Sequence, residues 1–260
     1  MPLTFFVLAN LAAVGLMMLG AWLASLKLRS VSFIDVFWGL GFVLVAWVSL
    51  LLSPADTARA VLLVALTTLW GLRLALHIGI RNHGKPEDRR YQEMRQKHGD
   101  RFALVSLFTV FLFQALLLWI VSLVVQLGIF AGQPVQLGFL SWIGIAVWSI
   151  GFIFETVADL QMLLFKRNPS NRGKVLDAGL WALSRHPNYF GESLMWWAIY
   201  ILVLPTGYGL PALISPVLIT FLLLKVSGVT LAEKDMTSRR PDYEAYRQRT
   251  STFIPWFPKK

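Results

Sequence analysis

The chain has 260 residues, of which 56% are hydrophobic and 15% are charged, and its mean hydropathy is +0.61. This composition is too apolar for a soluble domain of the same length and predicts an integral membrane protein. The formal net charge of +10 would suit nucleic acid, but long apolar stretches separate the basic residues, so no nucleic-acid partner is expected. The absence of cysteine excludes disulfides, thiolate metal sites and a cysteine nucleophile.

Seven apolar segments are long enough to cross a bilayer, which takes about 20 residues each. They comprise residues 3–26, 33–53, 57–80, 102–130, 138–165, 189–205 and 210–232. The first segment lacks the basic start and small-residue cleavage site of a secretory signal, so it is expected to be the first span. The sequence therefore predicts an all-α membrane protein with seven transmembrane helices in one domain, residues 1–260, without an internal repeat.

The basic residues predict how these helices are oriented. Of the 24 Lys and Arg residues, 21 lie in the segments 27–32, 81–101, 166–188 and 233–260. All four segments are cytoplasmic if the N-terminus is outside, as the positive-inside rule requires. We therefore expect a bacterial inner-membrane protein with its N-terminus outside and its C-terminus in the cytoplasm.

Ionisable residues also occur inside the predicted spans, where they are costly and normally face a bundle interior or a wet cavity. They are Asp35, Arg73, His77, Glu155, Asp159, Glu192 and Lys225. Asp35 suits a helix cap as well as a functional role, and Lys225 suits snorkelling to the interface. Glu155 and Asp159 lie four residues apart, so both carboxylates face one side of a helix. We expect Asp159 to accept hydrogen bonds from a ligand hydroxyl or a loop arginine.

The stretch from Asp177 to Trp197 runs from a basic loop straight into an apolar helix. Pro187 suits the first turn of that helix, which places Asn188 and Glu192 on one face of its start. Backbone N–H groups at the helix start, with Arg185 beside them, predict a site for an anion such as a phosphate. A capped helix after a positively charged loop explains Arg185 and Pro187 equally well, but it does not explain Glu192.

Familiar catalytic motifs are absent from the sequence. It contains no Walker-type loop, His-Glu-x-x-His, Gly-x-Ser-x-Gly or Gly-x-Gly-x-x-Gly motif, and its four histidines do not have the spacing of metal ligands. No metal site is therefore expected. The aromatic and charged tail, residues 233–260, suits either an interfacial segment or one that folds back over the cytoplasmic face.

From Gly179 to Glu192 the sequence reads GLWALSRHPNYFGE, after Asp159 in the fifth span and before a tail that ends in Phe253-Ile254-Pro255-Trp256. This order resembles the steroid 5-alpha-reductase family, including its bacterial DUF1295-type members, and is more distantly similar to membrane sterol reductases. The resemblance is most specific over about residues 138–260. Weaker matches in the first half are Ser32-x-x-Asp35-x-x-Trp38-Gly39, Trp70-Gly71-x-Arg73 and the turn Asn82-His83-Gly84-Lys85-Pro86.

The resemblance implies a membrane enzyme that transfers a hydride from NADPH to the beta carbon of a 3-oxo-4-ene steroid or another apolar enone. It implies a cofactor site on the cytoplasmic side, a substrate taken from membrane lipid, and no obligate protein partner. By motif position, the residues that line or adjoin the cofactor are Arg73, Asn82, Asp159, Arg172, Arg185, His186, Asn188, Tyr189, Glu192, Asp235 and Tyr246.

The chain departs from the family where the substrate ketone is held. A second-span glutamate and a third-span tyrosine do this in the animal enzymes, and the corresponding catalytic candidates here are Asp35 and Trp70. A donor at this position lowers the barrier because it binds the enolate more strongly than the ketone. The indole N–H of Trp70 donates a hydrogen bond but not a proton. The residues therefore support the cofactor half of the site better than the substrate half.

Two other functions remain open. An isoprenylcysteine-type membrane methyltransferase also carries an Arg-His-Pro-x-Tyr motif and a downstream glutamate, and it uses S-adenosylmethionine. A non-catalytic lipid-binding or transport protein would explain the hydrophobicity and the basic face, but it gives no reason for Asn188 and Glu192 together.

Overall fold

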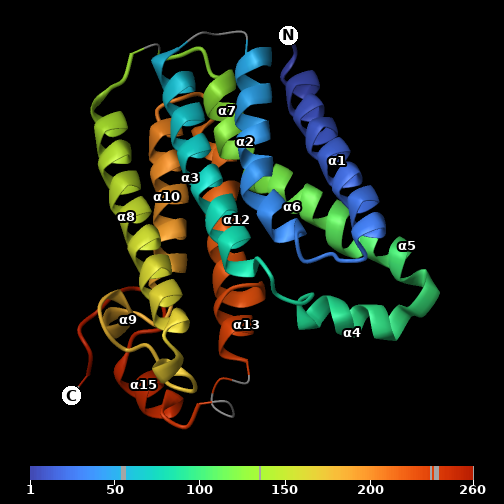
Figure 1. Ribbon diagram of the computed structural model, residues 1–260. Helices are drawn as coiled ribbons and strands as arrows, with labels where there is room; N and C mark the ends of the chain where they lie inside the picture. Colours follow the sequence, from blue (N-terminus) through green and yellow to red (C-terminus); the bar gives the residue numbers. More distant parts are fainter. Residues whose placement is uncertain (54–56, 135, 235, 237–239, 260) are drawn as a thin grey trace. The chain divides into compact units, whose positions relative to one another are not determined.

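A computed structural model describes residues 1–53, 57–134, 136–234, 236 and 240–259, and within them the regular structure is helical (Figure 1). The long helices are α1 (Leu3–Leu28), α2 (Ile34–Leu52), α3 (Ala58–Asn82), α8 (Phe139–Arg167) and α10 (Pro187–Val203). The shorter α-helices are α4 (Arg89–His98), α5 (Phe102–Ser106), α6 (Phe113–Val121), α7 (Leu123–Phe130), α9 (Leu180–Leu183), α11 (Gly209–Ala212), α12 (Ile214–Phe221), α13 (Val229–Glu233) and α15 (Tyr243–Arg249). Single turns of 3-10 helix are η1 (Gly99–Arg101) and η3 (Pro169–Asn171), and π-helical segments are η2 (Leu107–Leu112) and η4 (Leu222–Val226).

Six helical runs are long and apolar enough to cross a membrane. They are Leu3–Leu28, Ile34–Leu52, Ala58–Asn82, Arg89–Val121, Phe139–Arg167 and Gly209–Glu233. Large apolar side chains such as Leu16, Leu51 and Phe139 are exposed on these runs, which suits contact with lipid. The prediction of an all-α integral membrane protein is therefore confirmed. Helix α10 corresponds to the sixth predicted span, but its 17 residues fall short of a full crossing, so the seventh span stays a prediction.

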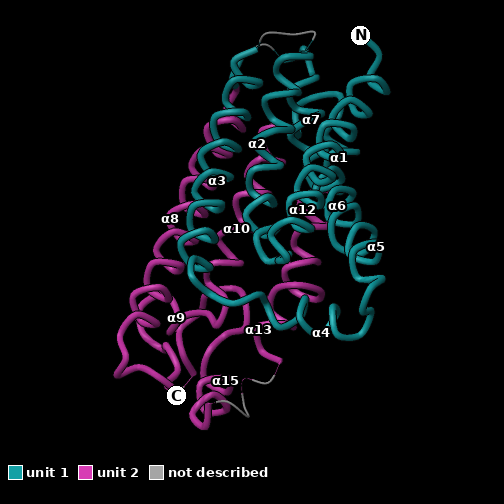
Figure 2. The backbone as a smooth tube through the Cα atoms, turned by 45° about the vertical axis from the view of Figure 1, so that its right-hand side comes forward, with its two compact units in different colours: residues 1–137, 203–214 teal, residues 138–202, 215–260 magenta. Residues whose placement is uncertain are grey.

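The helices divide into two compact units, which Figure 2 shows in different colours. The first unit contains residues 1–137 and 203–214, and the second contains residues 138–202 and 215–260. The second unit thus holds the fifth predicted span, the motif from Gly179 to Glu192, and the tail.

In the first unit, α2 and α3 pack with their backbones in close approach at Gly39 and Gly71. A Cβ atom on Gly39 would lie 2.5 Å from the carbonyl oxygen of Gly71, and one on Gly71 would lie 2.6 Å from that of Gly39. Small residues allow membrane helices to approach in this way, and van der Waals packing then holds them together.

The fourth predicted span, residues 102–130, is interrupted at Ser122, between α6 and α7. The Ser122 hydroxyl donates to the carbonyl oxygen of Trp119 at 2.8 Å and accepts from the amide of Gln126 at 2.8 Å. A side chain that bonds the preceding turn competes with the backbone ladder, so the helix breaks here. The apolar pattern of the segment does not reveal this break.

In the second unit, α8 and α10 form an antiparallel pair that is also closed by glycines. A Cβ atom on Gly191 would lie 2.6 Å from both the Glu155 nitrogen and the Gly151 carbonyl oxygen. Further along the pair, a Cβ atom on Gly144 would lie 2.9 Å from the Leu202 side chain and 3.1 Å from the Ala198 carbonyl oxygen. Helix α12 joins the pair through Thr220, whose hydroxyl lies 2.8 Å from that of Ser193.

Candidate functional site

A carboxylate and an amide meet across the α8–α10 interface. The Asn188 amide nitrogen donates to the Asp159 carboxylate at 3.1 Å, and the Asp159 residue is only 6% exposed. The amide oxygen of Asn188 is buried and has no hydrogen-bond partner among the described residues. An unsatisfied buried acceptor costs free energy, so its presence indicates a position where a donor from a ligand would be favourable.

Two further acids lie next to this pair. Glu155 is one helical turn from Asp159 on α8, and Glu192 is one turn from Asn188 on α10. Both are buried, and each has an interaction within the protein. The expected face of Asn188 and Glu192 is thus directed into the unit and not toward lipid. No group of three or more His, Cys, Asp or Glu side chains in the described part of the chain is placed to hold a metal ion.

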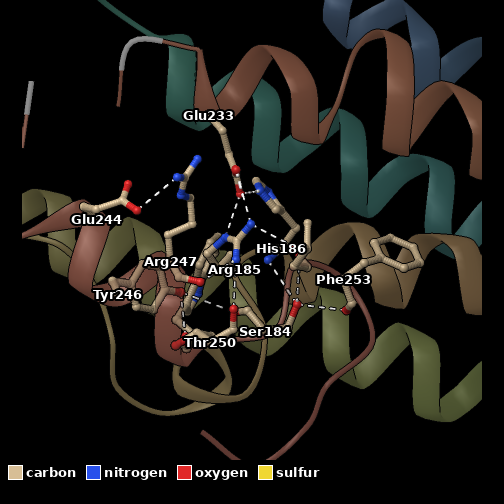
Figure 3. A network of polar contacts seen from close by, with 11 residues as sticks. Ser184, Arg185, His186, Glu233, Glu244, Tyr246, Arg247, Thr250 and Phe253 are labelled. Carbon is tan, nitrogen blue, oxygen red and sulfur yellow. Dashed lines mark hydrogen bonds and ion pairs between the residues drawn. The ribbon is translucent and has the colours of Figure 1, made fainter. Parts of the chain in front are cut away.

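The motif before α10 is held by an ion pair with the end of the last span. Arg185 and His186 both point toward Glu233 (Figure 3). The Arg185 Nε donates to Glu233 at 2.8 Å, and the His186 Nε2 lies 2.9 Å from the same carboxylate oxygen. Arg185 is 8% exposed. Burial works against its charge, but hydrogen bonding to Glu233 and the charge of that carboxylate outweigh this, so the pKa of Arg185 is raised.

The remaining donors of Arg185 bind the tail. Its Nη1 donates to the carbonyl oxygens of Arg247 and Thr250 at 3.0 and 2.8 Å, and its Nη2 donates to the Thr252 hydroxyl at 2.9 Å and to Glu233 at 3.3 Å. We call Arg185, Glu233 and these three tail positions the tail clamp. All five N–H groups of the guanidinium therefore have protein acceptors. In the structure the Arg185 guanidinium is thus engaged by the protein itself, and the anion site expected at the start of α10 stays a prediction.

Backbone contacts complete the attachment of the tail. The Arg185 nitrogen donates to the Ser251 carbonyl at 2.8 Å, and the Trp256 nitrogen donates to the Leu183 carbonyl at 2.9 Å. The Tyr246 hydroxyl donates to the Trp181 carbonyl at 2.6 Å. Burial is the main reason why the pKa of Tyr246 is raised. Of the two arrangements open for the tail, the structure has the one that folds back onto the motif.

The other expected cofactor residues of the second unit differ in exposure. Arg172 is exposed in the loop after η3, and its guanidinium makes no ion pair within the residues that the structure describes. Tyr189 stacks on His186, with ring centroids 5.5 Å apart and the planes 3° from parallel. Asp235 lies outside the described residues.

The first unit holds the other predicted site residues. Arg73 and Asn82 lie nine residues apart on α3, where the Asn82 amide oxygen accepts from Arg81 at 3.2 Å. Asp35 lies in the first turn of α2, whose N-cap residue is Phe33, and its carboxylate lies 3.9 Å from Arg90.

Trp70 is 2% exposed and packs edge-on against Phe42 at 5.4 Å. Phe42 lies seven residues beyond Asp35 on α2, which corresponds to about 10 Å of helix. The indole thus packs deeper along α2 than the carboxylate.

Glu233 is the main residue of the site that the sequence analysis did not identify. It lies 48 residues from Arg185 and reads as the first polar residue after an apolar span. The only signal for Glu233 in the sequence is that an acidic residue directly follows the last apolar span, on the same predicted side of the membrane as the basic segment 166–188.

Comparison with known proteins places these features in a family. A family model described as "Protein of unknown function (DUF1295)" matches residues 21–250. No solved structure matches the chain.

Three curated proteins show the range of relatives. The uncharacterized protein C594.04c of Schizosaccharomyces pombe is 26% identical over 76% of this chain and 63% of its own length. The Delta(14)-sterol reductase of Ascobolus immersus is 28% identical over 45% of this chain and 28% of its own. The probable O-methyltransferase ustE of Ustilaginoidea virens is 41% identical over 18% of this chain and 16% of its own. The chain thus spans less than two thirds of each relative. The distant similarity to sterol reductases that the motifs indicate is confirmed.

Proposed function

The chain belongs to the DUF1295 family, and we propose that it is a membrane reductase that uses NADPH to reduce the conjugated C=C bond of a 3-oxo-4-ene steroid or a similar apolar enone. The observation that carries this proposal is the buried, unpaired amide oxygen of Asn188 beside Asp159. The similarity to a Delta(14)-sterol reductase supports the reaction class. When bound, NADPH supplies the hydride for such a reduction.

The donors of a nicotinamide nucleotide fit the acceptor atoms of this site. The Asn188 amide oxygen has no hydrogen-bond donor among the described residues, and the carboxamide N–H and ribose O–H groups of the nucleotide can supply one. Glu192 extends the polar face by one turn of α10. We propose that Asp159, Asn188 and Glu192 hold and orient the nucleoside end of the cofactor.

The phosphates require cations. The last turn of α8 carries Lys166 and Arg167, and the loop after it carries Arg172 and Lys174. Arg172 is exposed without an ion pair in the described chain. Arginine binds phosphate oxygens in a bidentate manner, so we propose Arg172 as a phosphate ligand. Arg73 and Asn82 remain proposed cofactor residues on the strength of the resemblance alone, as does Asp235.

Arg185, His186 and Tyr246 are assigned a different role. Because the N–H groups of Arg185 are used within the tail clamp, we propose that these three residues position α10 and do not themselves bind the phosphates. Tyr189 stacks on His186 and belongs to the same positioning group.

For the substrate half, Asp35 and Trp70 are the proposed catalytic residues. Because Trp70 packs on Phe42, about 10 Å along α2 from Asp35, we propose that Asp35 faces the carbonyl oxygen of the enone and that Trp70 contacts another part of the substrate. The side chain of Asp35 is 25% exposed, whereas Trp70 is almost fully buried, so Asp35 is the more accessible of the two. A protonated Asp35 would donate a hydrogen bond that strengthens as charge develops on that oxygen. We further propose a bacterial inner-membrane location with the N-terminus outside and the cofactor site facing the cytoplasm, on the basis of the 21 clustered basic residues.

A membrane methyltransferase that uses S-adenosylmethionine is the second candidate. The short match to a probable O-methyltransferase favours it, as does the Arg-His-Pro-x-Tyr motif. S-adenosylmethionine carries no phosphate, so it gives no role to the exposed basic loop at Arg172. That loop is the reason why NADPH is preferred.

The test is thermal unfolding of the purified protein in detergent with NADPH, NADH or S-adenosylmethionine. A ligand at about 100 times its Kd stabilises the folded state by about 2.7 kcal/mol, which corresponds to a rise in Tm of about 5–10 °C for a chain of this size. We expect that rise with NADPH. A rise with S-adenosylmethionine alone would establish the methyltransferase instead, and no rise with any of them would favour a non-catalytic lipid-binding protein.

Asn188→Leu tests the site itself. The substitution removes the unsatisfied acceptor but also takes one donor from the buried Asp159 carboxylate, so the ligand-free protein should lose about 1–3 kcal/mol of stability and its Tm should fall accordingly. The rise with NADPH should be lost. Thr156→Val is the matched control, because the Thr156 hydroxyl on α8 is another buried oxygen without a partner among the described residues. If both variants keep the full rise, Asn188 is not a cofactor ligand.

A further inference from the structure

A hollow of about 190 Å³ lies in the first unit, between the end of α1 and the turn that joins α4 to α5. Its walls include Arg29, Arg95, Asp100 and Phe102. None of these residues belongs to the proposed reductase site. The proposed reductase site therefore does not account for the hollow.

The lengths of the helices place this hollow at the depth of lipid headgroups. Helix α1 has 26 residues and is about 39 Å long, whereas the hydrocarbon core of a bilayer is about 30 Å thick. The excess length falls at the end of α1 that carries Lys27 and leads to Arg29, because basic residues favour the headgroup region over the hydrocarbon. The polar helix α4 gives way to apolar sequence at Phe102, which marks the same boundary. Leu26 lines the hollow and is exposed, as are Leu23 on α1 and Leu104 on α5, so apolar surface suited to acyl chains lies close to it in the chain.

Arg95 is a fixed part of the wall. It donates to the Glu87 carboxylate at 3.1 and 3.3 Å, and its guanidinium lies 4.1 Å from the centroid of the Phe102 ring. It also donates to the Arg29 carbonyl oxygen at 3.3 Å, which ties α4 to the end of α1. The charge of Arg95 is thus already compensated by Glu87.

The two charges of the hollow that have no ion pair within the described chain have opposite signs. They are the guanidinium of Arg29 and the carboxylate of Asp100. A ligand that complements both must carry an anionic and a cationic group close together. A phospholipid with a phosphate and a primary ammonium meets this requirement, and its acyl chains continue along the exposed leucines.

The backbone of Arg29 supports a functional role for this residue. Its φ of 53° and ψ of 30° lie in the left-handed region, which favours glycine at the end of a helix. Strained conformations of non-glycine residues often occur at ligand sites. We propose that this hollow binds the headgroup of a zwitterionic phospholipid, with the phosphate on Arg29 and the ammonium on Asp100.

Native mass spectrometry of the delipidated full-length protein, titrated with phosphatidylethanolamine or phosphatidylglycerol in detergent, tests this proposal. Arg29→Gly removes the guanidinium but suits the left-handed backbone, so this variant should fold at least as well as the wild type. It should bind phosphatidylethanolamine about tenfold more weakly, the factor expected for the loss of one charge-assisted hydrogen bond. Asp100→Asn should abolish the preference for phosphatidylethanolamine over phosphatidylglycerol.

Arg89→Gln is the matched control, since Arg89 is an exposed cation of α4 that pairs with Glu93 and does not line the hollow. It should leave lipid binding unchanged. An equal loss in Arg29→Gly and Arg89→Gln would show that surface charge alone holds the lipid, and unchanged binding by Arg29→Gly would also overturn the proposal. Complete displacement of the lipid by millimolar inorganic phosphate would identify a free-phosphate site instead.

Discussion

Glu233→Gln should release the tail from the motif before α10. The substitution keeps the size of the side chain but removes the negative charge that faces Arg185 and His186. Arg185 would then remain buried with only neutral acceptors, the carbonyl oxygens of Arg247 and Thr250 and the hydroxyl of Thr252. Because these same groups attach the tail to the motif, the substitution should weaken the attachment of the tail before it affects the rest of the fold.

The magnitude follows from the burial of the pair. Breaking a buried ion pair by removing one partner costs about 3–5 kcal/mol. The side chain of Glu233 is 19% exposed, and Gln retains one acceptor oxygen, so we expect a value near the lower end, about 3 kcal/mol. The population of molecules with a detached tail should rise by roughly two orders of magnitude, because about 1.4 kcal/mol corresponds to a factor of ten.

Limited proteolysis with trypsin measures this population, since the tail carries cleavage sites at Arg247 and Arg249. Glu244→Gln is the matched control. It removes an equal charge from an exposed pair with Arg247, and such pairs contribute about 0–1 kcal/mol. Glu233→Gln should be cleaved in the tail far faster than Glu244→Gln. Equal rates for the two variants would show that the tail clamp does not hold the tail.

Tyr246→Phe should destabilise the protein by about 1–2 kcal/mol, measured as a fall in Tm, because it leaves the buried carbonyl of Trp181 without its donor. The pKa of Tyr246 is raised in the folded state, so the wild type should lose stability as the pH rises above about 10, where an unfolded tyrosine ionises, and the variant should lose less. Gly191→Ala should cost about 1–3 kcal/mol and reduce NADPH binding, because the new Cβ would meet the Gly151 carbonyl at 2.6 Å. Gly79→Ala is its control and should not lower the Tm, since nothing lies within 4 Å of the added atom; equal effects of the two glycine substitutions would contradict the role assigned to the helix contact.

The sequence predicts the membrane helices well because crossing a bilayer requires long apolar runs, and these are visible without knowledge of packing. Six runs agree with that expectation. The break at Ser122 was not predictable, because it depends on hydrogen bonds of one hydroxyl within an apolar stretch. Helix α10 begins at Pro187, as expected, but it ends at Val203, so its 17 residues fall short of a full crossing.

Prediction of the site was limited by contacts between distant residues. The spacing of Asn188 and Glu192 placed both on one face of a helix, yet it did not reveal that Asn188 would meet Asp159, which lies 29 residues away. The motif identified Arg185 as important but suggested a phosphate as its partner. In the structure Arg185 pairs with Glu233, a contact that the motif did not reveal because it depends on how the tail folds back.

The position of the Asp159–Asn188 pair is determined by the backbones of α8 and α10 and not by the loop between them. Gly151 and Gly191 bring the two helices close enough for short side chains to meet, one turn of α10 away from the pair. Asp and Asn have short reach, so a wider spacing would separate the carboxylate from the amide. The unpaired oxygen of Asn188 is then presented from a rigid helix pair, which is the arrangement that holds a ligand with least reorganisation. The tail clamp holds Arg185, two residues before Pro187, and so fixes the segment that leads into the start of α10. In the function proposed above, the helix contact and the tail clamp would together orient the cofactor.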